Sequence, residues 1–427
     1  MTAPLSRRRG LVVGLVVALV VVRVVAIVVL LGSGIESERS ILGGDARRYE
    51  AIVGAPGTPY LDHEVEYPPV AVGLMAVVDR PTTLGTLVAL AVSQLALELA
   101  VAGLLAWAWS RRTGVVYLVL GTPMVLYPFL YVRIDLLAVF LAVLALALLR
   151  RGRPTGSGMA LAAAVYAKVW PLVLGPRLFL AGHRRAPAAF VATGVVGLVL
   201  WVAWAGTGGI GQIIGFRGAT GWQIESLPGI VLHALDPAAS TVQQGAWRTG
   251  VDATTPARVA LTVIGLTAVA LAWWWAQRAA RLARQRGDDT TVTVVLDGLG
   301  PLAAVLAMVV CSTIISPQYV LWFVPFAAVV AAGGDRTVAA LTLAAVTTST
   351  LGLLWIHGLV DGDALPVATV LVRNLALFAL LVRTLQGLVR LASGPAVPPA
   401  GADEPSTSPV AVAPGGPSSQ PGVRPPG

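Results

Sequence analysis

The stretch "YAKVWP" (Tyr166–Pro171) interrupts an apolar run that extends over residues 157–181. Lys168 is the single lysine of the chain, so the other 29 of its 30 basic residues (30 − 1 = 29) are arginines. Pro171 lacks a backbone N–H and breaks a helix, which divides the run into two pieces of about a dozen residues each. Each piece is shorter than the ~20 residues that a helix needs to cross a bilayer. We therefore predict that the run breaks near Lys168 and turns back as a re-entrant pair.

Composition places the rest of the chain in the membrane as well. Of the 427 residues, 56% are hydrophobic and only 12% are charged, whereas a soluble domain carries about 25% charged residues. We predict an all-α polytopic membrane protein with about ten transmembrane helices, because one span requires about 20 mostly apolar residues. The predicted spans are 11–31, 84–109, 114–130, 136–149, 187–206, 256–276, 292–315, 320–332, 337–355 and 367–391.

The arginines support this threading. Basic residues gather in cytoplasmic loops of membrane proteins, so the net charge of +9 indicates orientation and not nucleic-acid binding. All the arginine-rich segments fall on one side only if 157–181 returns to the side from which it enters. Both termini are then cytoplasmic, and the protein is a multi-pass protein of the plasma (inner) membrane. The arginine-rich segments are 7–9, 111–112, 150–153, 183–185 and 277–286.

The same threading divides the chain into parts. Residues 1–392 form one transmembrane domain, whose two large outer loops are 32–83 and 207–255. The apolar run 68–78 is too short to span and is expected at the outer surface. The tail, 393–427, is rich in Pro, Gly, Ser and Ala, so we predict a disordered cytoplasmic segment.

The first outer loop concentrates polar residues in "GGDARRYEAIVGAPGTPYLDHEVEYPP" (43–69). Asp45 follows two glycines directly before a predicted helical turn over 46–53, where a carboxylate can cap the helix or act as a general base. Tyr67 closes the same loop. The alternative is an ordinary solvated loop with Gly and Pro at its turns.

Two cations lie close to the predicted membrane boundary. Arg133, in "YVRID" (131–135), is either an ordinary loop charge or a contact for an anion held at that boundary. Arg133 and Asp135 are two residues apart and need not pair. Lys168 could extend toward lipid headgroups, or it could bind a phosphate as a compact point charge at the tip of the broken helix.

Two further polar segments complete the candidate set. The second outer loop contains Arg217, Trp222, Gln223 and Glu225, and the stretch "SPQYVLWFVP" (316–325) contains Gln318 and Tyr319. Tryptophan at an interface is normal, so Trp222 alone is weak support for a site. Cys311 is the single cysteine, and no spacing typical of a metal site is present, so neither a disulfide nor a bound metal is indicated.

Five segments, taken in order, resemble one family, the polyprenol-phosphate-mannose-dependent mannosyltransferases of glycosyltransferase family eighty-seven, which belong to the GT-C class. The resemblance covers about residues 10–390. Its carriers are "GGDARRYEAIVGAPGTPYLDHEVEYPP" (43–69), "YVRIDLLAVFLAVLAL" (131–146), "AAAVYAKVWPLVLGP" (162–176), "RGATGWQIESLPG" (217–229) and "SPQYVLWFVPF" (316–326).

The resemblance implies a GT-C-like bundle with short re-entrant and outer-face helices, and a function. An acidic residue of the first outer loop is the catalytic base in that class, and Asp45 is the position that fits. The implied donor is a sugar on a polyprenyl phosphate, and the implied acceptor is a (glyco)lipid or envelope glycan. The implied reaction inverts the anomeric centre at the outer face and uses no metal or other cofactor. The "RID" stretch departs from the glutamine- or phenylalanine-containing versions of relatives, which weakens the assignment of Arg133.

These implications assign roles to the candidate residues. Asp45 would be the base, and Lys168, with Arg133 or Arg217, would hold the phosphate. The residues expected to contact the sugars are Tyr67, Trp222, Gln223, Glu225, Gln318 and Tyr319. Two alternatives stay open: a transporter or flippase of an envelope glycolipid, which also needs broken helices and membrane-depth charges, and a non-catalytic membrane scaffold.

Overall fold

The computed structural model describes residues 3–34, 43–215, 220–243, 245–250 and 255–394. These residues are overwhelmingly helical, which confirms the predicted all-α polytopic membrane fold. Among them, seven helices are long and apolar enough to cross a membrane. They are α1 (Ala3–Leu31), α4 (Thr83–Ala108), α9 (Arg185–Ala205), α12 (Thr255–Gln285), the continuous helix of α13 (Asp289–Thr293), η6 (Val294–Leu299) and α14 (Gly300–Val310), α16 (Arg336–Leu354) and α18 (Ala364–Ala392).

The other three predicted spans are present as shorter or interrupted helices, which fall below the length of these seven. The run 114–130 divides into α5 (Arg111–Gly121) and two 3-10 turns, η1 (Thr122–Leu126) and η2 (Phe129–Val132), because prolines at 123 and 128 cannot continue a helix. The runs 136–149 and 320–332 become α6 (Asp135–Arg150, 16 residues) and α15 (Val320–Ala332, 13 residues). Both pack largely inside the bundle, where a helix need not match the bilayer thickness.

The predicted re-entrant pair is confirmed by the path of the chain. Helix α7 (Pro154–Ala167) ends at Lys168, whose backbone is extended. The chain then continues through the 3-10 turn η3 (Trp170–Leu174) and the short helix α8 (Gly175–Phe179) before α9 begins. The indole N–H of Trp273 donates to the carbonyl of Val173 at 2.8 Å, so the broken backbone is partly satisfied by protein, as irregular structure at membrane depth requires.

The packing of α7 on α9 shows the reversal. At the start of α7, the Cα of Gly158 faces Ala186 so closely that no side chain would fit. Near the end of α7, the ring of Tyr166 packs on Gly197, and its hydroxyl donates to the carbonyl of Gly194. The two consecutive helices are therefore parallel, and the segment between them must return to the side where α7 began.

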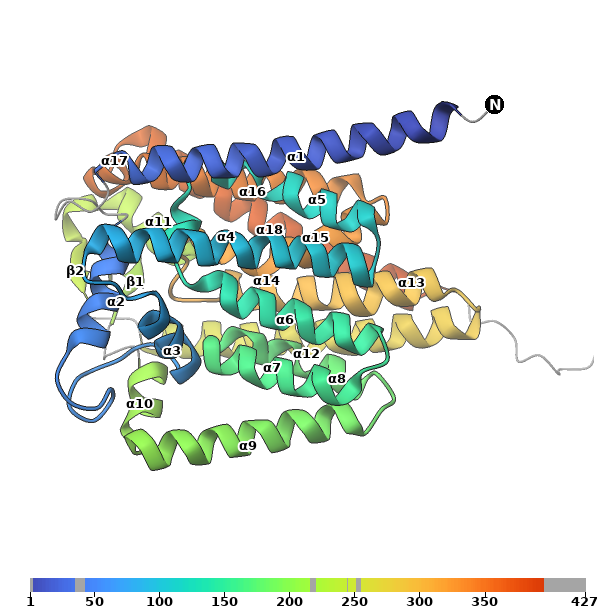
Figure 1. Ribbon diagram of the computed structural model, residues 1–427, viewed down its shortest axis with the longest axis horizontal. Coiled ribbons are helices and arrows are strands. Elements are labelled where there is room, and N and C mark those ends of the chain that lie inside the picture. The colour runs from blue at the N-terminus through green and yellow to red at the C-terminus, as the bar shows by residue number, and fades with distance from the viewer. Residues whose placement is uncertain (1–2, 35–42, 216–219, 244, 251–254, 395–427) are drawn as a thin grey trace, which may run out of the picture. The chain divides into compact units, whose positions relative to one another are not determined.

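The segments that connect the long helices lie at the two ends of the bundle (Figure 1). At one end, here called the loop end, lie the segments that the sequence predicts to be outside. They include α2 (Gly44–Gly54), α3 (Pro69–Val78), α10 (Gly208–Ile214), α11 (Leu227–Leu235) and α17 (Ile356–Asp361). The 3-10 turn η5 (Pro237–Ala239) follows α11, and the 3-10 turn η7 (Pro317–Tyr319) precedes α15. The arginine-bearing turns after α4, α6, α8 and α12 lie at the opposite end, here called the arginine end. These arginine-bearing turns therefore share one end, as the threading predicts.

A small antiparallel sheet, which the sequence analysis does not anticipate, lies at the loop end. Its strand order is β1-β3-β2, formed by β1 (Trp222–Gln223), β3 (Ala246–Thr249) and β2 (Thr241–Gln243). Gln223 is paired with Arg248, and the backbone N–H of Gln223 donates to the carbonyl of Thr313 at 3.1 Å. The second outer loop is thereby tied to the segment that precedes η7.

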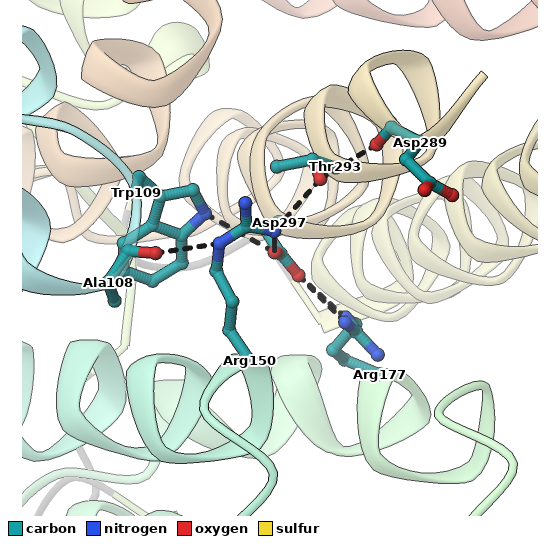
Figure 2. Close-up of polar contacts among 7 residues, drawn as sticks. All are labelled: Ala108, Trp109, Arg150, Arg177, Asp289, Thr293 and Asp297. Carbon is teal, nitrogen blue, oxygen red and sulfur yellow. Dashed lines mark hydrogen bonds and ion pairs between the residues drawn. The ribbon is translucent and has the colours of Figure 1, made fainter.

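The returning half of the re-entrant pair is anchored at the arginine end (Figure 2). Arg177 of α8 donates from Nε and Nη2 to Oδ1 of Asp297 at 2.9 and 2.8 Å. The indole N–H of Trp109 donates to Oδ2 of Asp297 at 3.3 Å, and Arg150 lies 3.5 Å from the same oxygen. Asp297 belongs to η6, a π-helical turn. Three elements thus converge on one buried carboxylate.

Candidate functional site

Asp45 and Arg133 form an ion pair at the loop end. Asp45 stands in the first turn of α2, which begins at Gly44 and so includes Asp45 instead of starting after it as predicted. Arg133 follows η2 in an extended conformation. Nη1 of Arg133 contacts Oδ2 of Asp45, and the side chains are 17% and 23% exposed respectively. Within the described chain, no residue hydrogen-bonds Oδ1 of Asp45, and the Nε of Arg133 is buried without a partner. The Asp45 side chain is therefore partly accessible to a ligand.

Asp135 and Lys168 form a second ion pair beside the first. Nζ of Lys168 donates to Oδ1 of Asp135 at 2.6 Å. Asp135 is nearly fully buried, with 3% of its side chain exposed, while 23% of the Lys168 side chain is exposed. An ammonium has three donors, so this pair orients the lysine and leaves donors toward the exposed side.

The two pairs are brought together by one short segment. Arg133 and Asp135 are two residues apart, so their Cα atoms lie within about 7 Å of each other. Asp45 and Lys168 are 123 residues apart in the sequence (168 − 45 = 123), yet each contacts this segment. The four formal charges of the two pairs sum to zero. The arrangement places two carboxylates and two cations, drawn from three distant parts of the chain, in one small region.

Aromatic rings enclose Lys168. Its ammonium lies 5.6 Å from the ring centroid of Tyr319 and 5.2 Å from that of Trp322. These two rings stack at 3.8 Å, and Trp170 stacks on Trp322 at 5.4 Å. The indole N–H of Trp322 also donates to Asp135 at 2.9 Å. The stack therefore connects the tip of the re-entrant pair to α15, and the predicted site residue Tyr319 belongs to the same cluster as Lys168.

The first outer loop contributes two more aromatic residues. Tyr67 packs edge-on against Tyr49 of α2, with ring centroids 5.7 Å apart. Burial raises the pKa of both phenols, and the charge of Asp135 raises it further. Both phenols are therefore neutral hydrogen-bonding groups near neutral pH, and the predicted residue Tyr67 lies within electrostatic range of Asp135.

Three other acids of the first loop have partners elsewhere. Glu66 pairs with Arg48 at 2.8 Å. Asp62 accepts from the backbone of Thr58 at 2.5 Å, and Glu50 accepts from the hydroxyl of Thr83 at 3.1 Å. None of these acids has a described contact with Asp45. Another acid, Asp135, stands two residues after Arg133, the partner of Asp45, and its charge acts on Arg133.

Glu225 is the residue of the second outer loop that is coupled to this region. It is buried, and its Oε1 accepts from Arg373 of α18 at 3.2 Å while Oε2 accepts from Gln223 at 3.1 Å. Burial raises the pKa of Glu225, and the charges of Arg373 and Arg133 oppose that rise. Burial likewise lowers the pKa of Arg133, while Asp135 and Glu225 oppose that change. Glu225 therefore lies within electrostatic range of the first ion pair.

The other predicted contacts are less closely joined to the ion pairs. Trp222 is 5% exposed and Gln318 is 9% exposed, and neither has a described hydrogen bond to Asp45 or Lys168. Arg217 lies outside the described residues. Trp222, Gln223 and Gln318 thus stay predictions as sugar contacts.

Sequence reasoning missed Asp135, Trp322 and Arg373. A signal for Asp135 was present, since a lysine at membrane depth requires an anionic partner, and Asp135 opens an apolar run at the same predicted boundary. Arg373 similarly interrupts the run 367–391. Nothing in the sequence distinguishes Trp322 from the other tryptophans.

Comparison with known proteins supplies one match. The sequence pattern of glycosyltransferase family 87 matches residues 66–317. The matched range includes Arg133, Asp135, Lys168 and Glu225, and begins after Asp45. No curated protein and no solved structure matches the chain.

Proposed function

Because the chain belongs to glycosyltransferase family 87, we propose that it transfers a sugar, and more specifically mannose, from a polyprenyl phosphate to a lipid or glycan acceptor at the outer face of the membrane. The two neighbouring ion pairs at the loop end support this proposal. Asp45–Arg133 and Asp135–Lys168 supply the base and the cations that such a transfer requires.

Asp45 acts as the general base. An acceptor hydroxyl must lose its proton as it attacks the anomeric carbon, and a carboxylate within hydrogen-bond reach can take that proton. Arg133 holds Oδ2 of Asp45, which leaves Oδ1 to accept the proton. The bond from the anomeric carbon to the phosphate oxygen breaks as the new bond forms on the opposite face, so the configuration inverts.

Lys168 and Arg133 stabilise the departing phosphate. Negative charge accumulates on the phosphate oxygen as the glycosidic bond breaks, and positioned cations stabilise that charge. Lys168 retains donors beyond its bond to Asp135, and the guanidinium of Arg133 lies beside Asp45. Asp135 orients the ammonium in the absence of substrate. Arg217 is a further candidate for the phosphate.

The test measures transfer of radiolabelled mannose from a polyprenyl phosphate to envelope glycolipids in membranes that contain the full chain. We expect Asp45→Asn to abolish transfer, because the amide cannot accept the proton, while insertion and folding are retained. Arg48→Gln is the matched control, because Arg48 belongs to the same helix but pairs with Glu66. Full activity of Asp45→Asn would refute the assignment of the base.

The alternative is a transporter or flippase of an envelope glycolipid. It would move the labelled lipid between the leaflets of proteoliposomes without forming a new glycosidic bond. The same assay, with products separated by chromatography, therefore distinguishes the two functions.

A further inference from the structure

A buried polar cluster, Arg23–Glu98–Tyr131, lies inside the membrane domain and takes no part in the reaction proposed above. Arg23 is the one charged residue of the apolar stretch 10–31, and its side chain is fully buried. Its Nε donates to both carboxylate oxygens of Glu98, at 2.9 and 3.0 Å. Glu98 belongs to the apolar helix α4 and is 2% exposed. A charge at this depth is costly unless it is paired.

The cluster is nearly saturated with hydrogen bonds. Nη1 and Nη2 of Arg23 donate to the carbonyls of Leu19 and Leu118, at 3.0 and 2.9 Å respectively. The hydroxyl of Tyr131 donates to Oε2 of Glu98 at 2.5 Å. A buried ion pair is weak support for stability, because well-packed apolar side chains often stabilise as much. The directional hydrogen bonds of the cluster, however, restrain the segments that they join.

Tyr131 connects the cluster to the candidate site. It belongs to η2, is fully buried and stands two residues before Arg133. The side chains of Phe129, Leu130 and Val132 are buried as well, but apolar contacts alone do not fix the rotation of a short 3-10 turn. The hydrogen bond to Glu98 is a directional restraint on that turn, and the turn sets the direction in which Arg133 leaves toward Asp45.

We infer that Glu98 and Tyr131 are positioning residues, which hold η2 so that Arg133 meets Asp45 and Asp135 meets Lys168. Arg23 orients Glu98 through two hydrogen bonds, and so couples the first membrane helix to the site. This inference rests on the proposed function, because it takes Arg133 and Asp45 as parts of the catalytic site.

The test is a double-substitution cycle in the purified full-length protein. Tyr131→Phe removes only the hydroxyl, and we expect kcat for sugar transfer to fall about tenfold, because small misplacements of reacting groups have large effects. In an Arg133→Lys background, Tyr131→Phe should cause no further loss, since the residue that it positions has already changed. Glu98→Gln, which weakens the same restraint, should show the same coupling.

Tyr117→Phe is the matched control. Tyr117 is also buried, on α5, close to Arg23 and Glu98, but no hydrogen bond joins its hydroxyl to Glu98 within the described residues. Its kcat should stay within about twofold of the parent value. Equal losses for Tyr131→Phe in both backgrounds, or an unchanged kcat, would overturn the inference and leave the assignment of Asp45 intact.

Hydrogen–deuterium exchange provides a readout that does not depend on activity. Peptides covering 127–135 should exchange faster in Tyr131→Phe than in Tyr117→Phe, whereas peptides from α18 should be unaffected. Unchanged exchange in 127–135 would also contradict the inference. If the parent protein transferred no sugar, the proposed function would fail, while this measurement would still decide whether Tyr131 restrains η2.

Discussion

Asp135 at the loop end and Asp297 at the arginine end are two buried carboxylates with the same kind of partners. Their side chains are 3% and 2% exposed. Each accepts an indole N–H, from Trp322 and Trp109 respectively. Each also pairs with a cation of the re-entrant segment, Lys168 for Asp135 and Arg177 for Asp297. The two carboxylates therefore hold the tip and the base of the same broken helix.

The difference lies in what surrounds each pair. Arg177 is 9% exposed and Asp297 has a second arginine, Arg150, beside it. Lys168 is 23% exposed and lies beside another ion pair whose members come from distant segments. A buried ion pair alone is thus a property of the fold. Exposure alone does not separate the two ends, because Arg150 is 32% exposed; the presence of a second carboxylate, Asp45, with its own cation is what indicates a site at the loop end.

The arginine end also has a cavity, but this cavity does not indicate a second substrate site. At the arginine end, a cavity of about 280 Å³ is bordered by Trp109, Arg150, Asp289 and Thr293. Arg150 is already engaged there, with bonds to the carbonyl of Ala108 and the hydroxyl of Thr293, both at 2.8 Å. The cation that borders this cavity is therefore occupied in holding the fold.

The largest expected effect is on stability and concerns the arginine end. Asp297→Asn leaves Arg177 and Arg150 without a counter-charge, and removal of one partner of a buried ion pair typically costs about 3–5 kcal/mol. We expect a marked fall in the thermal unfolding temperature in detergent, with the rate of transfer per folded molecule retained. A loss of turnover in well-folded Asp297→Asn protein would contradict the assignment of a purely structural role to the arginine end.

The second prediction concerns Lys168. Lys168→Met should raise the KM for the polyprenyl-phosphate donor about a hundredfold, because a charge-assisted contact is worth about 2–3 kcal/mol. The KM for the acceptor should change little. Arg177→Met is the counterpart at the other end and should leave both KM values unchanged. Similar losses for donor and acceptor in Lys168→Met would instead indicate a structural role for the lysine.

The smallest expected effect is on turnover and concerns Trp322 and Trp109. Trp322→Phe and Trp109→Phe each remove one hydrogen bond to a carboxylate, which is worth about 1 kcal/mol. Turnover should fall about fivefold in Trp322→Phe, because Asp135 then holds Lys168 less firmly, and should stay unchanged in Trp109→Phe. Steady-state kinetics at saturating donor would separate the two, and identical turnover in both variants would count against a positioning role for Asp135.

The sequence by itself determined the membrane class, the sidedness of the arginines and the break at Lys168. These properties depend on local composition: apolar length, clustered charge and a proline that cannot continue a helix. It also supplied Asp45 and Lys168 as candidates, since a carboxylate at a helix start and a lysine in an apolar run stand out against their neighbours.

Only the tertiary structure decided the partners. Lys168 and Asp135 are 33 residues apart, Arg23 and Glu98 are 75 apart, and Arg177 and Asp297 are 120 apart. No spacing rule connects such positions, because the packing of helices chooses which charged side chains meet. The same packing buries α6 and α15 among the other helices.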